Sequence, residues 1–216
     1  MERVRVKICG VKTAQDALCA AMHGADAIGL VFCEGSPRTI SIDQARLITS
    51  DLPPFISVVG LFMNSSEQLI RQVLNDIDLD IIQFHGDEPP EECRSYGRPY
   101  IKAVPMKVTD KDNSKSVEQI LQEYQQRYYD SKGFVVDSHA PGESGGSGET
   151  FDWNSLPHDS AKLIILAGGL NPDNVAQAIK LAKPFCVDVS SGVESQKGVK
   201  DHQKIAAFIR GVNSVS

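Results

Sequence analysis

The sequence lacks the features that mark metalloproteins, disulfide-bonded proteins and membrane proteins. Its five cysteines are an odd number without a Cys-x-x-Cys pair, which disfavours a disulfide framework and a zinc ribbon. Its five histidines form neither a His-x-His nor a His-Glu-x-x-His motif, so we expect no metal. No apolar run reaches the roughly 18 residues of a membrane span, and no signal-peptide core is present. We therefore expect a cytoplasmic chain with reduced thiols and no membrane partner.

Basic charge is also scarce. The formal net charge is −6, so no positive surface predicts binding to nucleic acid or to an anionic membrane. With 216 residues, of which 41 % are hydrophobic and 23 % charged, the composition is that of an ordinary globular protein. No linker or charge block divides the chain, which favours a single domain over residues 1–216.

Short apolar runs recur along the whole chain. Most are rich in Val and Ile and apolar on both faces, which is typical of strands buried on both sides of a parallel sheet. The eight runs are Val4–Cys9, Ala27–Phe32, Phe55–Phe62, Asp80–His85, Tyr100–Val104, Phe134–Asp137, Leu163–Ala167 and Phe185–Val189.

Segments with helical periodicity alternate with these runs. They span 13–23, 41–50, 65–74, 89–96, 116–129, 171–182 and 200–210, and Pro172 is expected at the first position of its helix. This alternation, repeated in little more than 200 residues, predicts an α/β protein with a (β/α)8 TIM barrel. A doubly wound sheet is the structural alternative, but its Gly-x-Gly-x-x-Gly fingerprint is absent after the first run.

Strand alternation predicts which side chains point into the barrel. If Val4, Val6 and Ile8 face the helices, then Lys7 and Cys9 face inward. The same parity brings polar side chains to the carboxyl ends of four strands, where barrel active sites lie. These residues are Cys9, His85, Asp137 and Asp188.

Cys9 and Asp137 are unlike titratable groups on different strands. One proton donor and one acceptor placed across a substrate are what an isomerisation requires. Lys7 is a cationic neighbour for a Cys9 thiolate. The glycine-rich segment after Asp137, about residues 138–150 with Gly145, Gly146, Ser147 and Gly148, predicts a lid that excludes water and keeps Asp137 protonated.

Two later loops predict an anion site. Gly168 and Gly169 follow the seventh run, and Ser190, Ser191 and Gly192 follow the eighth. The loops after strands seven and eight of a barrel frequently bind phosphate, although a Gly-Gly pair also simply closes a turn. Arg38, in a loop stiffened by Pro37, suits a carboxylate or phosphate, and a solvated surface arginine is the alternative.

These residues resemble those of one known family. The chain is similar to phosphoribosylanthranilate isomerases of tryptophan biosynthesis from its first strand to its last. The matching segments are Val6-Lys7-Ile8-Cys9-Gly10, Gly24-Ala25-Asp26-Ala27, Ser36-Pro37-Arg38 with Ile40-Ser41, Gln83-Phe84-His85-Gly86, Asp137 with Gly145-Gly146-Ser147-Gly148 and Phe151-Asp152-Trp153, Ala167-Gly168-Gly169-Leu170-Asn171-Pro172, and Val187-Asp188-Val189-Ser190-Ser191-Gly192-Val193-Glu194.

The resemblance implies an Amadori rearrangement of a small phosphosugar, N-(5′-phosphoribosyl)anthranilate, without cofactor or metal. It implies that Asp137 is the general acid that opens the ribose ring and that Cys9 is the general base. Arg38 would face the anthranilate, and Asp188 the sugar or the cationic nitrogen, with Lys7 and His85 as further substrate-binding residues. Gly168, Gly169, Ser190, Ser191 and Gly192 would hold the phosphate.

Two other functions remain open at this stage. Another phosphosugar barrel enzyme, a Schiff-base aldolase or the indole-glycerol-phosphate synthase type, predicts a catalytic lysine at Lys7 or Lys102. A non-catalytic phosphate-binding barrel predicts the loss of one acid–base partner. The sequence leaves open whether the chain is a monomer or a homodimer, and whether it accepts the related histidine-pathway aminoaldose.

Overall fold

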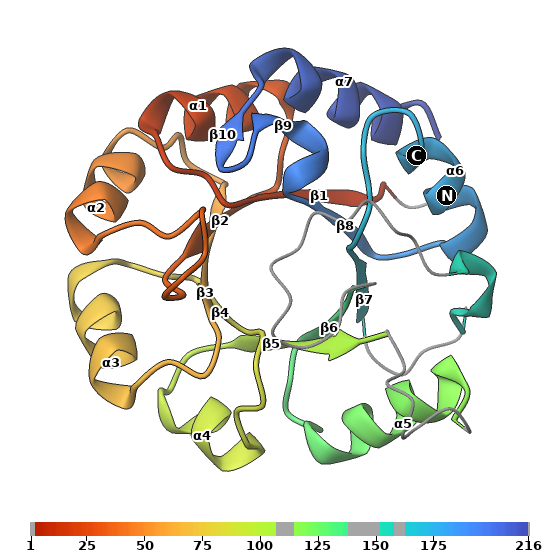
Figure 1. Ribbon diagram of the computed structural model, residues 1–216, viewed down its shortest axis with the longest axis horizontal. Helices are drawn as coiled ribbons and strands as arrows, with labels where there is room; N and C mark the ends of the chain where they lie inside the picture. The colour runs from red at the N-terminus through yellow and green to blue at the C-terminus, as the bar shows by residue number, and fades with distance from the viewer. Residues whose placement is uncertain (1–2, 107–114, 138–151, 158–162, 216) are drawn as a thin grey trace.

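Eight parallel strands form a closed barrel in the order of the sequence (Figure 1). The computed structural model describes residues 3–106, 115–137, 152–157 and 163–215. This architecture confirms the predicted (β/α)8 barrel. The strands are β1 (Arg5–Cys9), β2 (Ala27–Val31), β3 (Ser57–Phe62), β4 (Ile81–Phe84), β5 (Tyr100–Pro105), β6 (Gly133–Asp137), β7 (Leu163–Leu166) and β8 (Cys186–Val189).

Helices surround the barrel (Figure 1). They are α1 (Ala14–His23), α2 (Ile42–Ser50), α3 (Glu67–Asp76), α4 (Pro90–Ser95), α5 (Val117–Arg127), α6 (Val175–Ala182) and α7 (His202–Asn213), with a short 3-10 helix, η1 (Trp153–Ser155), between β6 and β7. Side chains of Thr13, Ser41, Ser66, Ser116 and Asp201 accept hydrogen bonds from the first turns of their helices. These caps satisfy backbone N–H groups that a helix leaves unpaired, which fixes where each helix begins.

The prediction that Pro172 starts its helix is wrong. Residues 171–174 form a turn, and α6 begins at Val175. Within this turn the Asn171 side chain accepts from the backbone N–H groups of Asp173 and Asn174, and the Asn174 side chain accepts from the Asn171 N–H. Asparagine side chains thus compete with the helix for backbone hydrogen bonds.

A two-stranded hairpin follows β8 and was not predicted. After the 3-10 helix η2 (Ser191–Val193), strands β9 (Glu194–Gln196) and β10 (Val199–Lys200) pair antiparallel. Gly198 has a φ of 81°, and a Cβ on it would lie 2.6 Å from the Pro37 carbonyl oxygen. Glycine is therefore required at this turn, which lies directly on the loop before Arg38.

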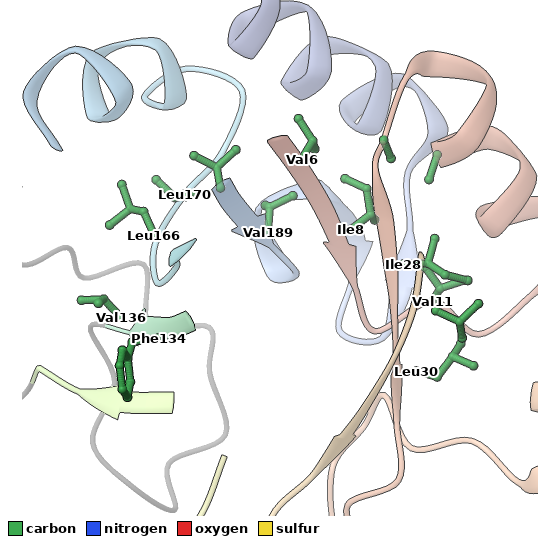
Figure 2. Packing of buried hydrophobic residues seen from close by; sticks show 14 of the residues in the cluster. Val6, Ile8, Val11, Ile28, Leu30, Phe134, Val136, Leu166, Leu170 and Val189 are labelled. Carbon is green, nitrogen blue, oxygen red and sulfur yellow. The ribbon is translucent and has the colours of Figure 1, made fainter. Parts of the chain in front are cut away.

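Apolar side chains fill two separate layers. Val6, Ile8 and Ile28 belong to the large cluster between strands and helices (Figure 2). A second cluster fills the barrel interior with alternate residues of its strands, among them Val59, Val135 and Ile165. The predicted parity of the strands is confirmed by this division. Among the described residues, no helix is long and apolar enough to cross a membrane.

A buried ion pair ties together the loops after β3 and β4. The Lys102 amine on β5 donates to the carbonyl groups of Phe84 and Gly86 and lies 3.4 Å from the Glu88 carboxylate. Glu88 accepts in turn from the backbone N–H groups of Asn64 and Gly86. Because the exposed fractions of the two charged side chains are 0 % and 1 %, each needs the other as a partner.

Replacing Glu88 with Ala should lower the free energy of unfolding by about 3–5 kcal/mol, because it leaves the Lys102 charge buried without its partner. Urea unfolding followed by circular dichroism measures this change. Glu67→Ala is the matched control, because it removes an exposed Glu67–Arg71 pair, which contributes little. Equal unfolding midpoints for the two variants would contradict the structural role of the buried pair.

Candidate active site

A pocket of about 490 Å³ lies at the carboxyl ends of the barrel strands. This volume suits a small-molecule ligand. Nine residues predicted from the sequence line it: Cys9, Arg38, His85, Asp137, Gly168, Gly169, Asp188, Ser190 and Ser191. Lys7 and Gly192 are not among the residues that line it. The predicted lid residues Gly145, Gly146, Ser147 and Gly148 lie outside the described residues, so the lid stays a prediction.

Lys7 and Asp188 form a buried ion pair at the seam between the first and last strands. The two residues lie opposite each other in the pairing of β1 with β8, and Lys7 Nζ is 2.7 Å from Asp188 Oδ2. Burial lowers the pKa of Lys7, but Asp188 and Cys9 raise it, and the net shift is upward, so the amine is charged. Asp188 Oδ1 is buried and has no hydrogen-bond partner among the described residues. Asp188 therefore has an acceptor left for a ligand in the pocket.

Cys9 lies beside this pair. Burial raises the pKa of the Cys9 thiol, Lys7 lowers it and Asp188 raises it, and the net shift is upward. A Cβ on Gly29, the residue paired with Cys9 on β2, would lie 2.8 Å from the Cys9 sulfur. Glycine at this position therefore leaves the space that the thiol occupies.

His85 connects β4 to Asp137 on β6. Its Nε2 is 3.9 Å from Asp137 Oδ2, and its Nδ1 is 3.1 Å from the side-chain nitrogen of Gln83. Burial lowers the pKa of His85, so the ring is neutral at pH 7. With the Gln83 amide assigned as donor, Nδ1 is the acceptor and the ring proton resides on Nε2, towards Asp137. The arrangement can orient Asp137 and its proton.

The loops after β7 and β8 pack tightly against each other. Gly168 and Gly169 have φ angles of 79° and 66°, which favour glycine. A Cβ on Gly192 would lie 1.8 Å from the Leu170 carbonyl oxygen, so only glycine fits there. The two glycine loops therefore lie against each other beside the pocket, and the anion site there stays a prediction.

Arg38 reaches the pocket from the loop after β2, but its guanidinium has a protein partner. Its Nε and Nη2 are 2.7 and 3.0 Å from the two carboxylate oxygens of Glu194. Burial raises the pKa of Glu194, but Arg38 and Lys200 bring it down to about 2. Arg38 is thus neither a surface arginine nor wholly available to a ligand, because two of its nitrogens are engaged.

Several residues at the site were missed in the sequence. Glu194 and Lys200 lie in the unpredicted hairpin, and nothing in their spacing marks Arg38 as their partner. An apolar wall of the pocket was not predicted either. It consists of Val31, Cys33 and Leu61, which cluster with Cys9 at the ends of β2 and β3. Their inward strand parity was the signal that could have revealed it. The strands β2 and β3 lie across the barrel from β7 (Figure 1).

The closed eight-stranded barrel, with a polar pocket at the carboxyl ends of its strands, has the architecture of a TIM-barrel enzyme. Comparison with known proteins identifies the family. The model of the N-(5′-phosphoribosyl)anthranilate isomerase family matches residues 6–211. A relative named N-(5′-phosphoribosyl)anthranilate isomerase from Pseudomonas putida is 49 % identical over 98 % of each chain.

Solved structures agree with the family match. The phosphoribosyl anthranilate isomerase of Thermotoga maritima has a TM-score of 0.85 at 40 % identity, covering 98 % of this chain and 99 % of that one. A second structure, of the same kind of isomerase in complex with reduced 1-(o-carboxyphenylamino)-1-deoxyribulose 5-phosphate, has a TM-score of 0.80 at 40 % identity with the same coverage. The chain therefore belongs to the N-(5′-phosphoribosyl)anthranilate isomerase family, which confirms the family and enzyme class predicted from the sequence.

The pKa of Cys9 predicts how its thiol reacts. Because burial raises this pKa, the rate of iodoacetamide alkylation at Cys9 should still be increasing with pH above the ordinary thiol pKa of about 9. Peptide mapping by mass spectrometry measures the rate at Cys9 alone. In Lys7→Met, the midpoint should move higher, because the cation that lowers the pKa is gone. A rate that is already constant at neutral pH would contradict the raised pKa.

Proposed function

We propose that the chain converts N-(5′-phosphoribosyl)anthranilate to 1-(2-carboxyphenylamino)-1-deoxyribulose 5-phosphate, with Asp137 as general acid and Cys9 as general base. The observation that carries the proposal is the position of the two groups. Cys9 on β1 and Asp137 on β6 line one pocket, between an apolar wall on β2 and β3 and the glycine loops after β7 and β8.

The pocket has one region for each part of the substrate. The loops at Gly168 and Ser190 suit the phosphate, because glycines leave backbone N–H groups accessible and serine adds a donor. The wall of Val31, Cys33 and Leu61 suits the aromatic ring, with Arg38 beside it for the carboxylate. The ligand of the solved family member carries the same three groups, a phosphate, an aromatic ring and a carboxylate, which supports a pocket with three such regions.

Asp137 and Cys9, the two titratable residues at strand ends, act one after the other. Asp137 gives its proton to the ribose ring oxygen, the C1′–O bond breaks, and the anthranilate nitrogen forms a protonated Schiff base with C1′. Cys9 then removes the C2′ proton, and the electrons of that bond form the C1′-amino enol. The enol becomes the ketone when C1′ gains a proton and the 2′-hydroxyl loses its own. Asp188 Oδ1 suits the nitrogen that becomes cationic, since it is a carboxylate oxygen without another partner among the described residues.

The alternative functions have less support. A Schiff base on the protein needs a lysine with a depressed pKa in the pocket. The pKa of Lys7 is raised and its amine is held by Asp188, whereas Lys102 does not line the pocket. A non-catalytic barrel does not explain why both Cys9 and Asp137 face the same cavity. The cytoplasmic location and the choice between monomer and homodimer stay predictions.

Cys9→Ala and Asp137→Asn should each lower kcat by roughly 10²–10⁴-fold, which is what a proton-transfer group typically contributes. Cys33→Ala is the matched control, because Cys33 lines the same pocket but has no role in proton transfer. The decrease in substrate fluorescence measures turnover of the three purified variants. Near wild-type kcat in Cys9→Ala or Asp137→Asn would reject that residue as acid or base.

Arg38→Met should raise KM roughly 10- to 100-fold with a smaller change in kcat, because it removes a charged hydrogen-bond donor to the anthranilate carboxylate. The corresponding phosphoribosyl aniline, which lacks the carboxylate, separates this effect from general damage. Its inhibition constant against the normal substrate should be similar in the wild type and the variant. An equal loss for both compounds would remove Arg38 from carboxylate binding.

A further inference from the structure

Three charged side chains form a buried cluster beneath the loop after β8. Arg38 from the loop after β2, Glu194 on β9 and Lys200 on β10 have side chains that are 9 %, 4 % and 1 % exposed. One carboxylate joins them, since Glu194 Oε1 is 2.7 Å from Arg38 Nε and 3.0 Å from Lys200 Nζ. The cluster therefore links the arginine on one side of the pocket to the hairpin after β8.

Lys200 also holds the pocket wall itself. Its Nζ donates to the Ser190 backbone carbonyl at 3.0 Å and to the Ser190 hydroxyl at 3.4 Å. Ser190 lines the pocket, whereas Lys200 does not. The lysine is thus placed behind the loop, where its charge acts on a ligand through Ser190 rather than by touching it.

The charges of the cluster do not balance. Burial lowers the pKa of Lys200 and Glu194 opposes this shift. With all three side chains ionised, Arg38 and Lys200 carry two positive charges and Glu194 carries one negative charge. The neighbouring Lys7–Asp188 pair is neutral in itself and does not change this balance. A buried excess of positive charge is costly unless an anion approaches, so the cluster favours an anionic group at the adjacent loop.

Close packing keeps the cluster next to the reactive end of β1. Gly10, which follows Cys9, has a φ of 73°. A Cβ on it would lie 2.6 Å from Arg38 Cδ and 3.1 Å from the Ser190 hydroxyl. Arg38 and Ser190 therefore both lie close to Gly10, and a side chain at this position would collide with Arg38.

We propose that Lys200 is a positioning residue that fixes Ser190 and supplies the excess positive charge by which this loop selects a phosphate dianion. Glu194 holds the cations of Lys200 and Arg38 in their separate directions. This proposal rests on the proposed function, because it concerns the phosphate of the same substrate. It assigns a role to two residues that lie outside the barrel strands and outside the two glycine loops.

The effect of Lys200 extends to Cys9. Burial raises the pKa of the Cys9 thiol, and Lys200 is one of two cations, with Lys7, that lower it. One buried lysine is thus linked both to Ser190, by hydrogen bonds, and to Cys9, through its charge.

The affinity for inorganic phosphate tests the proposal without requiring turnover. Isothermal titration calorimetry should show binding at least about tenfold weaker in Lys200→Met than in the wild type, because the excess cation is lost. Lys200→Arg, which keeps the charge, should bind phosphate more tightly than Lys200→Met. Lys204→Met is the matched control, because the exposed Lys204 amine donates to the Glu194 backbone carbonyl and to no other group of the described residues. Its affinity should equal that of the wild type.

For Glu194→Gln the expected change in phosphate affinity has the opposite sign. This variant also tests the proposal if Lys200→Met does not fold. Glutamine keeps a side-chain oxygen that accepts hydrogen bonds from Arg38 and Lys200, so both cations stay in place while the excess positive charge increases. Phosphate should therefore bind as tightly as in the wild type or more tightly. A purely structural role for the cluster predicts weaker binding in both variants. Unchanged affinity in a folded Lys200→Met, or weaker binding in Glu194→Gln, would overturn the proposal. A wild type that binds phosphate but does not turn over the substrate would instead reject the proposed function.

Discussion

The pairing of β1 with β8 is the interaction on which the rest of the structure depends. It closes the barrel and places Lys7 opposite Asp188, two residues that are 181 positions apart in the sequence. The same seam brings Cys9 beside this ion pair and Ser190 over Gly10. Closing the sheet and building the site are therefore one event, since the proton acceptor and the anion loop become neighbours only when the last strand pairs with the first.

Buried charge surrounds the mouth of the barrel. The Lys7–Asp188 and Lys102–Glu88 pairs and the Arg38–Glu194–Lys200 cluster are each almost inaccessible to water. Such pairs contribute little to stability when desolvation is considered, but each fixes the direction of a loop or a side chain. A mouth built in this way is rigid on the β1, β4 and β8 sides, which is what preorganised acid–base chemistry requires.

Much of the fold could be predicted from the sequence because strand parity and helix caps are local. Alternation alone placed Cys9 and Asp137 at the pocket, and serine or threonine caps marked most helix starts. The partnership of Arg38 with Glu194 could not be predicted, because it joins segments 156 positions apart through a hairpin with no apolar alternation. The start of α6 was predicted wrongly, because Pro172 was expected to begin the helix. Instead, asparagine side chains accept hydrogen bonds from the backbone N–H groups of this segment and hold it in a turn.

The central claim is that Asp137 and Cys9 act in different steps, ring opening and removal of the C2′ proton. The most direct test is the kinetic isotope effect on kcat with substrate deuterated at C2′. In Cys9→Ala, removal of this proton limits the rate, so a large primary isotope effect is expected. In Asp137→Asn, ring opening limits the rate, so the effect should nearly vanish. Equal isotope effects in the two variants, or the reverse order, would contradict the assignment of the two residues.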